Sequence, residues 1–231
     1  MNTTLLPAWT SALAVVAHPD DESFGLGAII DTFVQAGTAV HVLCLTQGEA
    51  STLGVQAGVD LAAIRAEELR EAGSRLGVAS TSLTNWPDGG LAASPESAVI
   101  DDILSAITTH RPDGLLVFEP HGITGHPDHI AATARALTAA EHTDLPVLAW
   151  TLPATVADTI RAEHGVALHG DVAAAIDIDL PVARKSQRQA IAAHASQAGP
   201  GSILWRRLEL LGDHETLRWL RRPAASPDPT L

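Results

Sequence analysis

Apolar runs alternate with periodic, polar stretches along most of the 231-residue chain. Short apolar runs bounded by turn-forming residues are typical of buried strands, and apolar residues at every third or fourth position are typical of helices. The runs predict strands over residues 11–17, 39–45, 82–85, 114–118 and 146–152. The periodic segments predict helices over residues 24–36, 60–76, 95–110 and 126–141. This alternation predicts an α/β fold of Rossmann-like topology, in which helices cover both faces of a mostly parallel sheet.

The pattern is weaker in the last third of the chain. Residues 171–178 alternate between apolar and polar positions and predict a further strand, whereas residues 181–195 have the periodicity of a helix. Residues 204–220 are amphipathic and leave helix and strand open. Residues 223–231 contain three prolines and predict a disordered tail. No repeat or linker interrupts the chain, so we expect one domain over residues 1–222.

Polar residues with metal-binding side chains follow two of the predicted strands. Residues 18–22 read His-Pro-Asp-Asp-Glu, and the tripeptide His-Pro-Asp recurs at residues 126–128, where His129 follows. In a parallel sheet, ligands bind beyond the carboxyl ends of the strands, where loops hold several polar groups together. We therefore expect these two loops to face one another across neighbouring strand ends.

The residue types in the two loops suit metal-assisted hydrolysis. Catalytic zinc typically takes three His or carboxylate ligands and keeps one position for water. Side chains three residues apart at a helix start can point the same way, which makes chelating pairs of His18 with Asp21 and of His126 with His129. A carboxylate near the metal would take a proton from water, and an imidazole would protonate the leaving group. The residues alone leave these roles open among His18, Asp20, Asp21, His126, Asp128 and His129.

The composition limits which partners the protein is expected to bind and in which cellular compartment it is expected to work. The formal net charge of −13 and the single lysine argue against nucleic acid, and we expect a small neutral or cationic substrate. One cysteine, Cys44, excludes an internal disulfide and suits a reducing compartment. No basic segment precedes the N-terminal apolar stretch, and no apolar run approaches the ~20 residues of a membrane span. We therefore expect a cytoplasmic protein without a membrane span.

Together, residues 17–22 and 126–129 resemble the two signature motifs of the LmbE-like, or PIG-L, family of zinc-dependent N-acetylglucosaminyl de-N-acetylases. The segments Arg-x-x-Glu-Leu at 65–69, Trp-Pro-Asp-Gly at 86–89 and His-Ala-Ser-Gln at 194–197 follow in the order that family has them. The resemblance therefore covers most of the chain. It implies removal of the N-acetyl group from a small molecule containing N-acetylglucosamine, with release of acetate. An amidase acting on a larger thiol-, lipid- or peptide-linked sugar conjugate, and a non-catalytic metal- or sugar-binding protein, are the alternatives.

The resemblance also implies a role for each polar residue of the two loops. The implied metal ligands are His18, Asp21 and His129. Asp20 would be the general base, and His126 the general acid and oxyanion partner, steadied by Asp128. The implied metal is Zn²⁺, with Fe²⁺ as an alternative because a His₂Asp ligand set accepts either ion. Glu22 would either join the site or support the loop from outside it.

Three further residues are candidate contacts to the substrate. Arg65 and Asp88 match family positions that contact the sugar, and His194 lies in the third supporting motif. The ordinary alternatives are an ion pair for Arg65, a turn position for Asp88 and a helix end for His194. Because the chain has no Tyr, where some family members use one to polarise the acetyl carbonyl, we expect His121, His194 or a backbone amide to take that task.

The C-terminal part of the chain carries a group of arginines: Arg206, Arg207, Arg218, Arg221 and Arg222. We expect these side chains to pair mainly with acidic residues of the same chain or of a neighbouring subunit, and an anionic ligand is the less favoured alternative. The family resemblance is compatible with a homo-oligomer.

Overall fold

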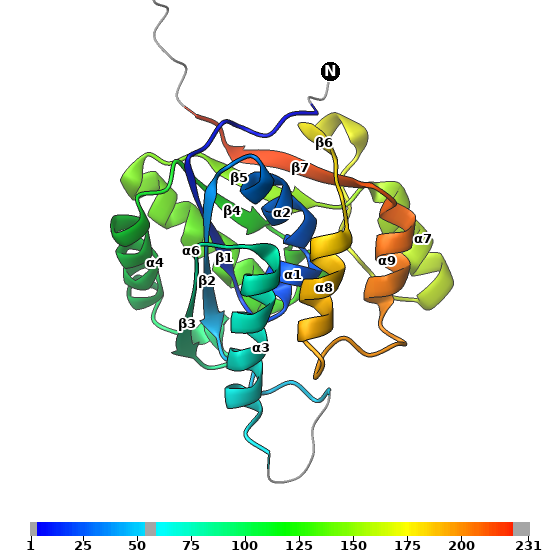
Figure 1. Ribbon diagram of the computed structural model, residues 1–231, viewed down its shortest axis with the longest axis horizontal. Coiled ribbons are helices and arrows are strands. Elements are labelled where there is room, and N and C mark those ends of the chain that lie inside the picture. The colour runs from blue at the N-terminus through cyan, green and yellow to red at the C-terminus, as the bar shows by residue number, and fades with distance from the viewer. Residues whose placement is uncertain (1–3, 54–58, 224–231) are drawn as a thin grey trace, which may run out of the picture.

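A seven-stranded sheet forms the centre of the molecule in the computed structural model, which describes residues 4–53 and 59–223 (Figure 1). Its strand order is β3-β2-β1-β4-β5-β7-β6. The strands are β1 (Ser11–Val16), β2 (Ala39–Thr46), β3 (Ser80–Trp86), β4 (Gly114–Phe118), β5 (Val147–Thr151), β6 (Ile178–Pro181) and β7 (His214–Arg221). Strands β1 to β5 pair in parallel, whereas β7 is antiparallel to β5 and to β6. The predicted mostly parallel α/β sheet is confirmed.

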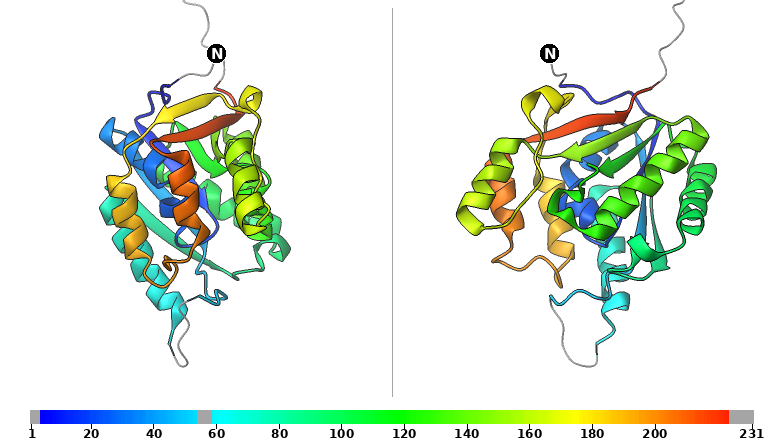
Figure 2. Two further views of the ribbon diagram at one scale, coloured as in Figure 1. Left: turned by 90° about the vertical axis from the view of Figure 1, so that its right-hand side faces the viewer. Right: turned by 180° about the vertical axis from the view of Figure 1, so that it is seen from behind.

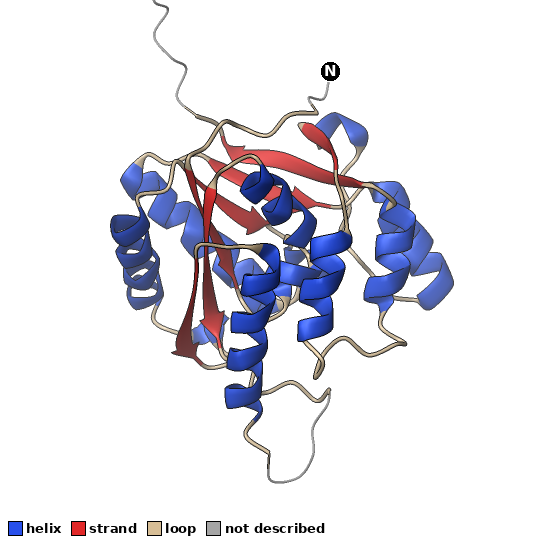
Figure 3. Ribbon diagram, viewed as in Figure 1, coloured by secondary structure: helices blue, strands red, loops and turns tan. Residues whose placement is uncertain are grey.

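Helices cover both faces of the sheet, as Figures 2 and 3 show. The longer ones are α2 (Gly27–Gln35), α3 (Leu61–Leu76), α4 (Glu96–His110), α6 (Pro127–Thr143), α7 (Ala154–His164), α8 (Lys185–Ala193) and α9 (Ile203–Leu211), and the single turns are α1 (Asp21–Phe24) and α5 (Gly122–Gly125). Alternate residues of β1 face opposite ways. Ala12, Ala14 and Val16 join an apolar core with α2 and α3, whereas Leu13 and Val15 join a second core with α4 and α6.

Local sequence signals explain where the helices near the site begin and end. The Asp60 carboxylate accepts the backbone N–H of Ala63 (3.2 Å) and caps α3, which ends at Gly77 with a φ of 73°. Helix α6 begins after His126 with Pro127 in its first turn, where the missing N–H of proline costs nothing. Both helices therefore start where the sequence predicts.

The prediction for residues 171–178 is wrong for most of that segment. Asp171 forms an isolated bridge with Pro153, a 3₁₀ turn (η2) spans Ala173–Ala175, and β6 begins only at Ile178. The Asp171 carboxylate accepts the hydroxyl of Thr151 (2.8 Å) and pairs with Arg218 (3.0 Å), which fixes this segment as a loop against β5. The alternating pattern of apolar and polar residues does not show that the Asp171 side chain binds the buried hydroxyl of Thr151.

Other differences from the prediction lie near the ends of elements. The helix predicted over residues 24–36 is divided into α1 and α2, and α7 was not predicted. The ambiguous segment 204–220 is a helix, α9, followed by a strand, β7. Of the predicted tail, residues 224–231 lie outside the described residues. Among the described residues, no helix is both long and apolar enough to cross a membrane.

Candidate active site

The two His-Pro-Asp loops meet at one cavity of about 680 Å³, at the carboxyl ends of β1 and β4. His18, Asp20 and Asp21 come from the loop after β1, and His126 and His129 come from the start of α6. These strands are neighbours in the sheet, so segments more than 100 residues apart in sequence lie side by side. The predicted meeting of the two loops is therefore what the structure shows.

Three of the side chains, His18, His129 and Asp21, form a triangle in which each of the two Asp21 oxygens faces one histidine. His18 Nδ1 lies 3.1 Å from His129 Nε2, His129 Nε2 lies 3.2 Å from Asp21 Oδ1, and His18 Nδ1 lies 3.6 Å from Asp21 Oδ2. Neighbouring ligands of a tetrahedral metal are about 3.3 Å apart. The spacing of the three groups is therefore close to that of metal ligands, and His18, His129 and His126 also form a cluster that could hold a metal ion.

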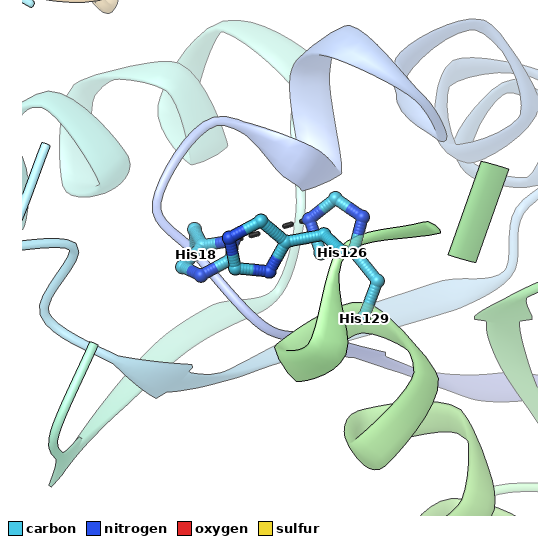
Figure 4. Close-up of side chains that lie close together, drawn as sticks. All are labelled: His18, His126 and His129. Atoms are coloured by element: carbon cyan, nitrogen blue, oxygen red, sulfur yellow. Dashed lines mark hydrogen bonds between the residues drawn. The ribbon is translucent and has the colours of Figure 1, made fainter. Parts of the chain in front are cut away.

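The rings of the three histidines gather around this point (Figure 4). The His126 ring centroid lies 4.8 Å from that of His18 and 5.1 Å from that of His129. His126 Nδ1 accepts the backbone N–H of Asp128 (3.2 Å) as the cap of α6, which fixes the ring at the edge of the cavity. Burial and the positive charges of His18 and His129 lower the pKa of His126.

Outer contacts orient the candidate ligands. His129 Nδ1 lies 3.0 Å from the carbonyl oxygen of Gly122, to which only a protonated Nδ1 can donate, so Nε2 points into the triangle. Gly122 has a φ of 66°, and a Cβ there would lie 2.6 Å from the Cβ of His129, so this close approach requires glycine. Asp21 Oδ2 accepts the backbone N–H groups of Ala17 (3.2 Å) and His18 (2.9 Å), which anchors its carboxylate to the end of β1.

The other nitrogen of His18 faces two carboxylates. Its Nε2 lies 3.1 Å from Asp88 Oδ1 and 3.4 Å from Asp128 Oδ2. Burial lowers the pKa of His18, but hydrogen bonds to Asp128, Asp21 and Asp88 outweigh it and raise the pKa to about 12. A carboxylate on one ring nitrogen leaves the other for a metal and raises its basicity. Asp88, expected at the substrate, thus also supports a candidate ligand.

Asp128 is fully buried and connects α6 to the loop after β3. Its Oδ2 accepts the backbone N–H of Gly89 (2.7 Å), and its Oδ1 accepts that of Leu91 (3.0 Å). The hydrogen bond between Asp128 and His126 is made by the backbone N–H of Asp128, which donates to Nδ1 of the His126 ring. Its carboxylate therefore fixes the loop and His18, and acts on the His126 ring through its charge.

Asp20 lies beside the triangle in a constrained conformation. Its φ is 135°, a region that non-glycine residues rarely adopt. Arg65 Nη2 lies 3.1 Å from Asp20 Oδ2 and also donates to the carbonyl oxygen of Pro19, while Arg65 Nη1 donates to that of Gly48 (2.8 Å). Burial and the charge of Asp21 raise the pKa of Asp20 to about 7, although Arg65 lowers it. Asp20 thus has the acidity of a general base that works near neutral pH.

His194 lies beneath this loop. It is fully buried, and its Nε2 lies 2.7 Å from Oε1 of Glu22, which is also fully buried. Glu22 Oε2 accepts the backbone N–H of Asp20 (3.0 Å). The structure therefore places His194 and Glu22 as supports of the Asp20 loop, and His194 is not among the described residues that border the cavity.

His121, considered as a partner for the acetyl carbonyl, points elsewhere. Its ring is stacked on that of His169 at 3.7 Å, and its Nδ1 lies 3.0 Å from Oε2 of the buried Glu119. His121 is likewise not among the described cavity-lining residues. The sequence prediction missed the apolar cavity residues Phe24, Phe118, Ile123 and Trp150, and it named Arg207 only as one of five arginines expected mainly to pair with acidic residues. Phe118 ends β4, so its position at the strand end was the available signal.

Comparisons with known sequences match the same part of the chain. A family model described as PIG-L, GlcNAc-PI de-N-acetylase, matches residues 13–140. A 1D-myo-inositol 2-acetamido-2-deoxy-alpha-D-glucopyranoside deacetylase of Corynebacterium diphtheriae is 28% identical over 254 residues, covering 94% of this chain and 85% of that protein. A probable N-acetylglucosaminyl-phosphatidylinositol de-N-acetylase of Schizosaccharomyces pombe is 36% identical over 133 residues, covering 55% of this chain and 50% of that protein.

Solved structures share the fold over almost the whole chain. A deacetylase of teicoplanin biosynthesis superimposes with a TM-score of 0.71 at 24% identity, covering 92% of this chain and 99% of that one. The N,N'-diacetylchitobiose deacetylase of Pyrococcus horikoshii has a TM-score of 0.64 at 23% identity, covering 92% and 84%. A 4-carboxy-2-hydroxymuconate hydratase of Pseudomonas putida has a TM-score of 0.68 at 20% identity, covering 95% and 99%. Since the fold carries more than one chemistry, function must be argued from the site.

Proposed function

Because the chain belongs to the PIG-L family, as its motifs indicate, we propose that it is a metal-dependent hydrolase that removes the N-acetyl group from a small molecule containing N-acetylglucosamine. Relatives named as deacetylases of N-acetylglucosaminides support this reaction. The observation that carries the proposal is the triangle of donor atoms from His18, Asp21 and His129 with the carboxylate of Asp20 beside it.

In this proposal His18, Asp21 and His129 hold the metal, as the family resemblance implies. The preferred ion is Zn²⁺, with Fe²⁺ as the alternative, because two imidazoles and one carboxylate suit both. When bound, a divalent ion supplies Lewis acidity to water and to the amide carbonyl. The carboxylates of Asp88 and Asp128 on the far nitrogen of His18 support this assignment, since such contacts orient histidine ligands.

Asp20 acts as the general base and His126 as the general acid. Asp20 takes a proton from the attacking water while the new C–O bond forms, and Arg65 and Glu22 hold it in place. His126, whose ring lies beside those of His18 and His129, gives a proton to the amide nitrogen as the C–N bond breaks. The products are acetate and the free amine.

The cavity supports a substrate larger than a single sugar. Its volume of about 680 Å³ lies within the roughly 300–1,000 Å³ of pockets that enclose drug-sized ligands. Besides the polar residues around His18, apolar side chains line it, among them Phe24, Phe118 and Trp150. A glycoside or a larger sugar conjugate would contact both kinds of side chain, and this favours a substituted N-acetylglucosamine as substrate.

Replacing Asp20 tests whether this residue acts as the general base and not as a metal ligand. In the metal-loaded Asp20→Asn variant we expect metal content close to that of the wild type and a loss of acetate release of about 10²–10⁴-fold, the usual contribution of acid–base catalysis. Asparagine also tolerates the positive φ of this position. The His129→Ala variant should instead lose both metal and activity. Equal loss of metal and turnover in Asp20→Asn would mean that Asp20 is a ligand and would contradict the assignment.

A further inference from the structure

Two arginines border the cavity, and they differ in their partners. Arg65 faces the Asp20 carboxylate at 3.1 Å, whereas Arg207, on α9, lies beside Trp150 and Phe24. The Arg207 guanidinium lies 4.8 Å from the centroid of the Trp150 ring, and its Nη2 donates to the carbonyl oxygen of Phe24. The Nε atom of Arg207 is buried without a hydrogen-bond partner. Among residues 4–53 and 59–223, no carboxylate lies within ion-pair distance of the Arg207 guanidinium.

The other arginines near the C-terminus behave as the sequence analysis expects. Each of the four pairs with an acidic side chain: Arg206 with Glu163 and Glu209, Arg218 with Asp171, Arg221 with Asp144, and Arg222 with Asp177. Arg207 differs from these four in its burial as well, since only 9% of its surface is exposed. It is therefore the member of the group that faces a cavity with its hydrogen-bonding capacity unfilled.

Arg207 keeps its charge at this position. Burial lowers the pKa of Arg207 to about 10, against the opposing effect of the Glu215 carboxylate, so the guanidinium is protonated at neutral pH. Glu215 is already bound by Arg184 (2.6 Å) and by Nε1 of Trp150 (2.8 Å). A buried charge without a counter-ion is costly, and an anion beside it in apolar surroundings interacts more strongly than in water. The part of the cavity beside Arg207 is thus suited to one negatively charged group.

We propose that Arg207 is a specificity-determining residue that binds a carboxylate or phosphate on the substituent of the amino sugar. This rests on the proposed function: the acetyl group that is removed is neutral, so the anion must belong to the rest of the substrate. The carboxylates of Asp20, Asp21 and Asp88 line the same cavity and disfavour an anion beside them, so the negative group is expected at Arg207, the cavity-lining arginine that has no ion-pair partner among the described residues. The fork of a guanidinium donates two parallel hydrogen bonds to either anion.

This substrate differs from the neutral or cationic one that composition predicts. The net charge of −13 describes the field around the whole molecule. Inside an apolar pocket, the nearest unpaired charge decides which ligand is bound, because interactions there are screened less than at the surface. One buried guanidinium therefore outweighs the acidic surface at this position.

The test compares three N-acetylglucosamine glycosides that differ only in the substituent: a neutral methyl, an anionic carboxymethyl and a 1-phosphate. Acetate release is measured with the metal-loaded wild type, Arg207→Met, Arg207→Lys and the matched control Arg206→Met, which changes the neighbouring exposed arginine of α9. We expect the wild type to prefer one anionic glycoside by about 10- to 100-fold in kcat/KM, the range of a charge-assisted hydrogen bond. Arg207→Met should abolish this preference, which is measured within each protein as the ratio of kcat/KM for the anionic glycoside to that for the neutral one.

Arg207→Lys should retain part of the preference, and Arg206→Met all of it. The preferred anion distinguishes a carboxylate from a phosphate as the natural group. No preference in the wild type, or equal loss on neutral and anionic glycosides in Arg207→Met, would overturn the proposal, the latter because it indicates a structural role.

Calorimetric binding of the same glycosides to the metal-loaded proteins separates this proposal from the proposed function. If no glycoside is hydrolysed, the deacetylase assignment fails. In that case the role of Arg207 is tested by binding alone: the wild type should bind an anionic glycoside more tightly than the neutral one, and Arg207→Met should bind both equally. Equal binding of all three glycosides to the wild type would overturn the proposal.

Discussion

Replacing Asp20 by Asn should make the metal-free protein more stable at neutral pH than the wild type. Burial and the neighbouring Asp21 raise the pKa of Asp20 from its ordinary value of 3.8 to about 7, so folding favours the protonated carboxyl group. A carboxyl group whose pKa is raised on folding contributes stability that is fully present below pH 3.8 and is lost as the pH rises to about 7. Asparagine keeps the shape of a protonated Asp and does not titrate.

The size of the effect follows from the two pKa values. They differ by about 3, and each pKa unit corresponds to about 1.36 kcal/mol, so the wild type should lose about 3 kcal/mol relative to Asp20→Asn between pH 4 and pH 7, because the folded carboxyl group is only half ionised at the upper limit. Other groups titrate in both proteins, and the comparison largely cancels them. Urea denaturation of both chelator-treated proteins, followed by tryptophan fluorescence at several pH values, measures this difference.

A difference in unfolding free energy that stays constant within about 1 kcal/mol from pH 4 to pH 7 would refute the reasoning, since each pKa unit should contribute about 1.36 kcal/mol. It would mean that Asp20 ionises normally in the folded protein. The outcome also bears on function, because a destabilised carboxylate is expected where catalysis needs a base with a pKa near the working pH.

Three further predictions follow from contacts in the site. Asp128→Asn should lower the unfolding free energy by about 1–3 kcal/mol, because the amide replaces one of two buried oxygens that accept backbone N–H groups, and unchanged stability in urea denaturation would contradict this. Gly48→Ala should reduce kcat/KM more than the control Gly89→Ala. Both glycines have positive φ, but only a Cβ at position 48 would overlap the Arg65 guanidinium. Equal effects of the two substitutions on kcat/KM would exclude a role for that overlap. Because neighbouring carboxylates raise the pKa of both His18 and His129, Zn²⁺ must displace protons from these ligands, and the apparent affinity should rise at least about tenfold per pH unit between pH 6 and 8; calorimetry that finds no proton release would contradict this.

Local patterns were sufficient to predict which polar residues of the two His-Pro-Asp loops meet at the cavity. The candidate ligands His18 and Asp21 are three residues apart at the end of a strand, and His129 is three residues from His126 at a helix start, so spacing brought each pair together. Parallel pairing of β1 with β4 then brought the two pairs together, as an α/β alternation implies. These predictions depended only on neighbours in sequence and on one general rule of sheet topology.

Residue patterns alone could not predict the rest of the cavity, because it depends on contacts between distant segments; only the family resemblance pointed to Arg65 and Asp88. Asp88 reaches His18 from the loop after β3, and Arg207 comes from α9, near the other end of the chain. No periodicity shows which of five nearby arginines is buried. Nor does sequence show that His194 faces a buried Glu22, since both would look equally natural on a surface. The packing of the last helices against α1 decides these positions.

Acetate release by the purified protein is the most direct test of the central claim that this site is a metal-dependent deacetylase. The protein would be stripped with a chelator, reloaded with Zn²⁺ or Fe²⁺ up to one equivalent, and assayed on a panel of N-acetylglucosamine glycosides with the metal content measured in parallel. The account predicts no release from the stripped protein and release that rises in proportion to bound metal up to one ion per chain. No release from any glycoside at full metal loading, or equal release without metal, would contradict it.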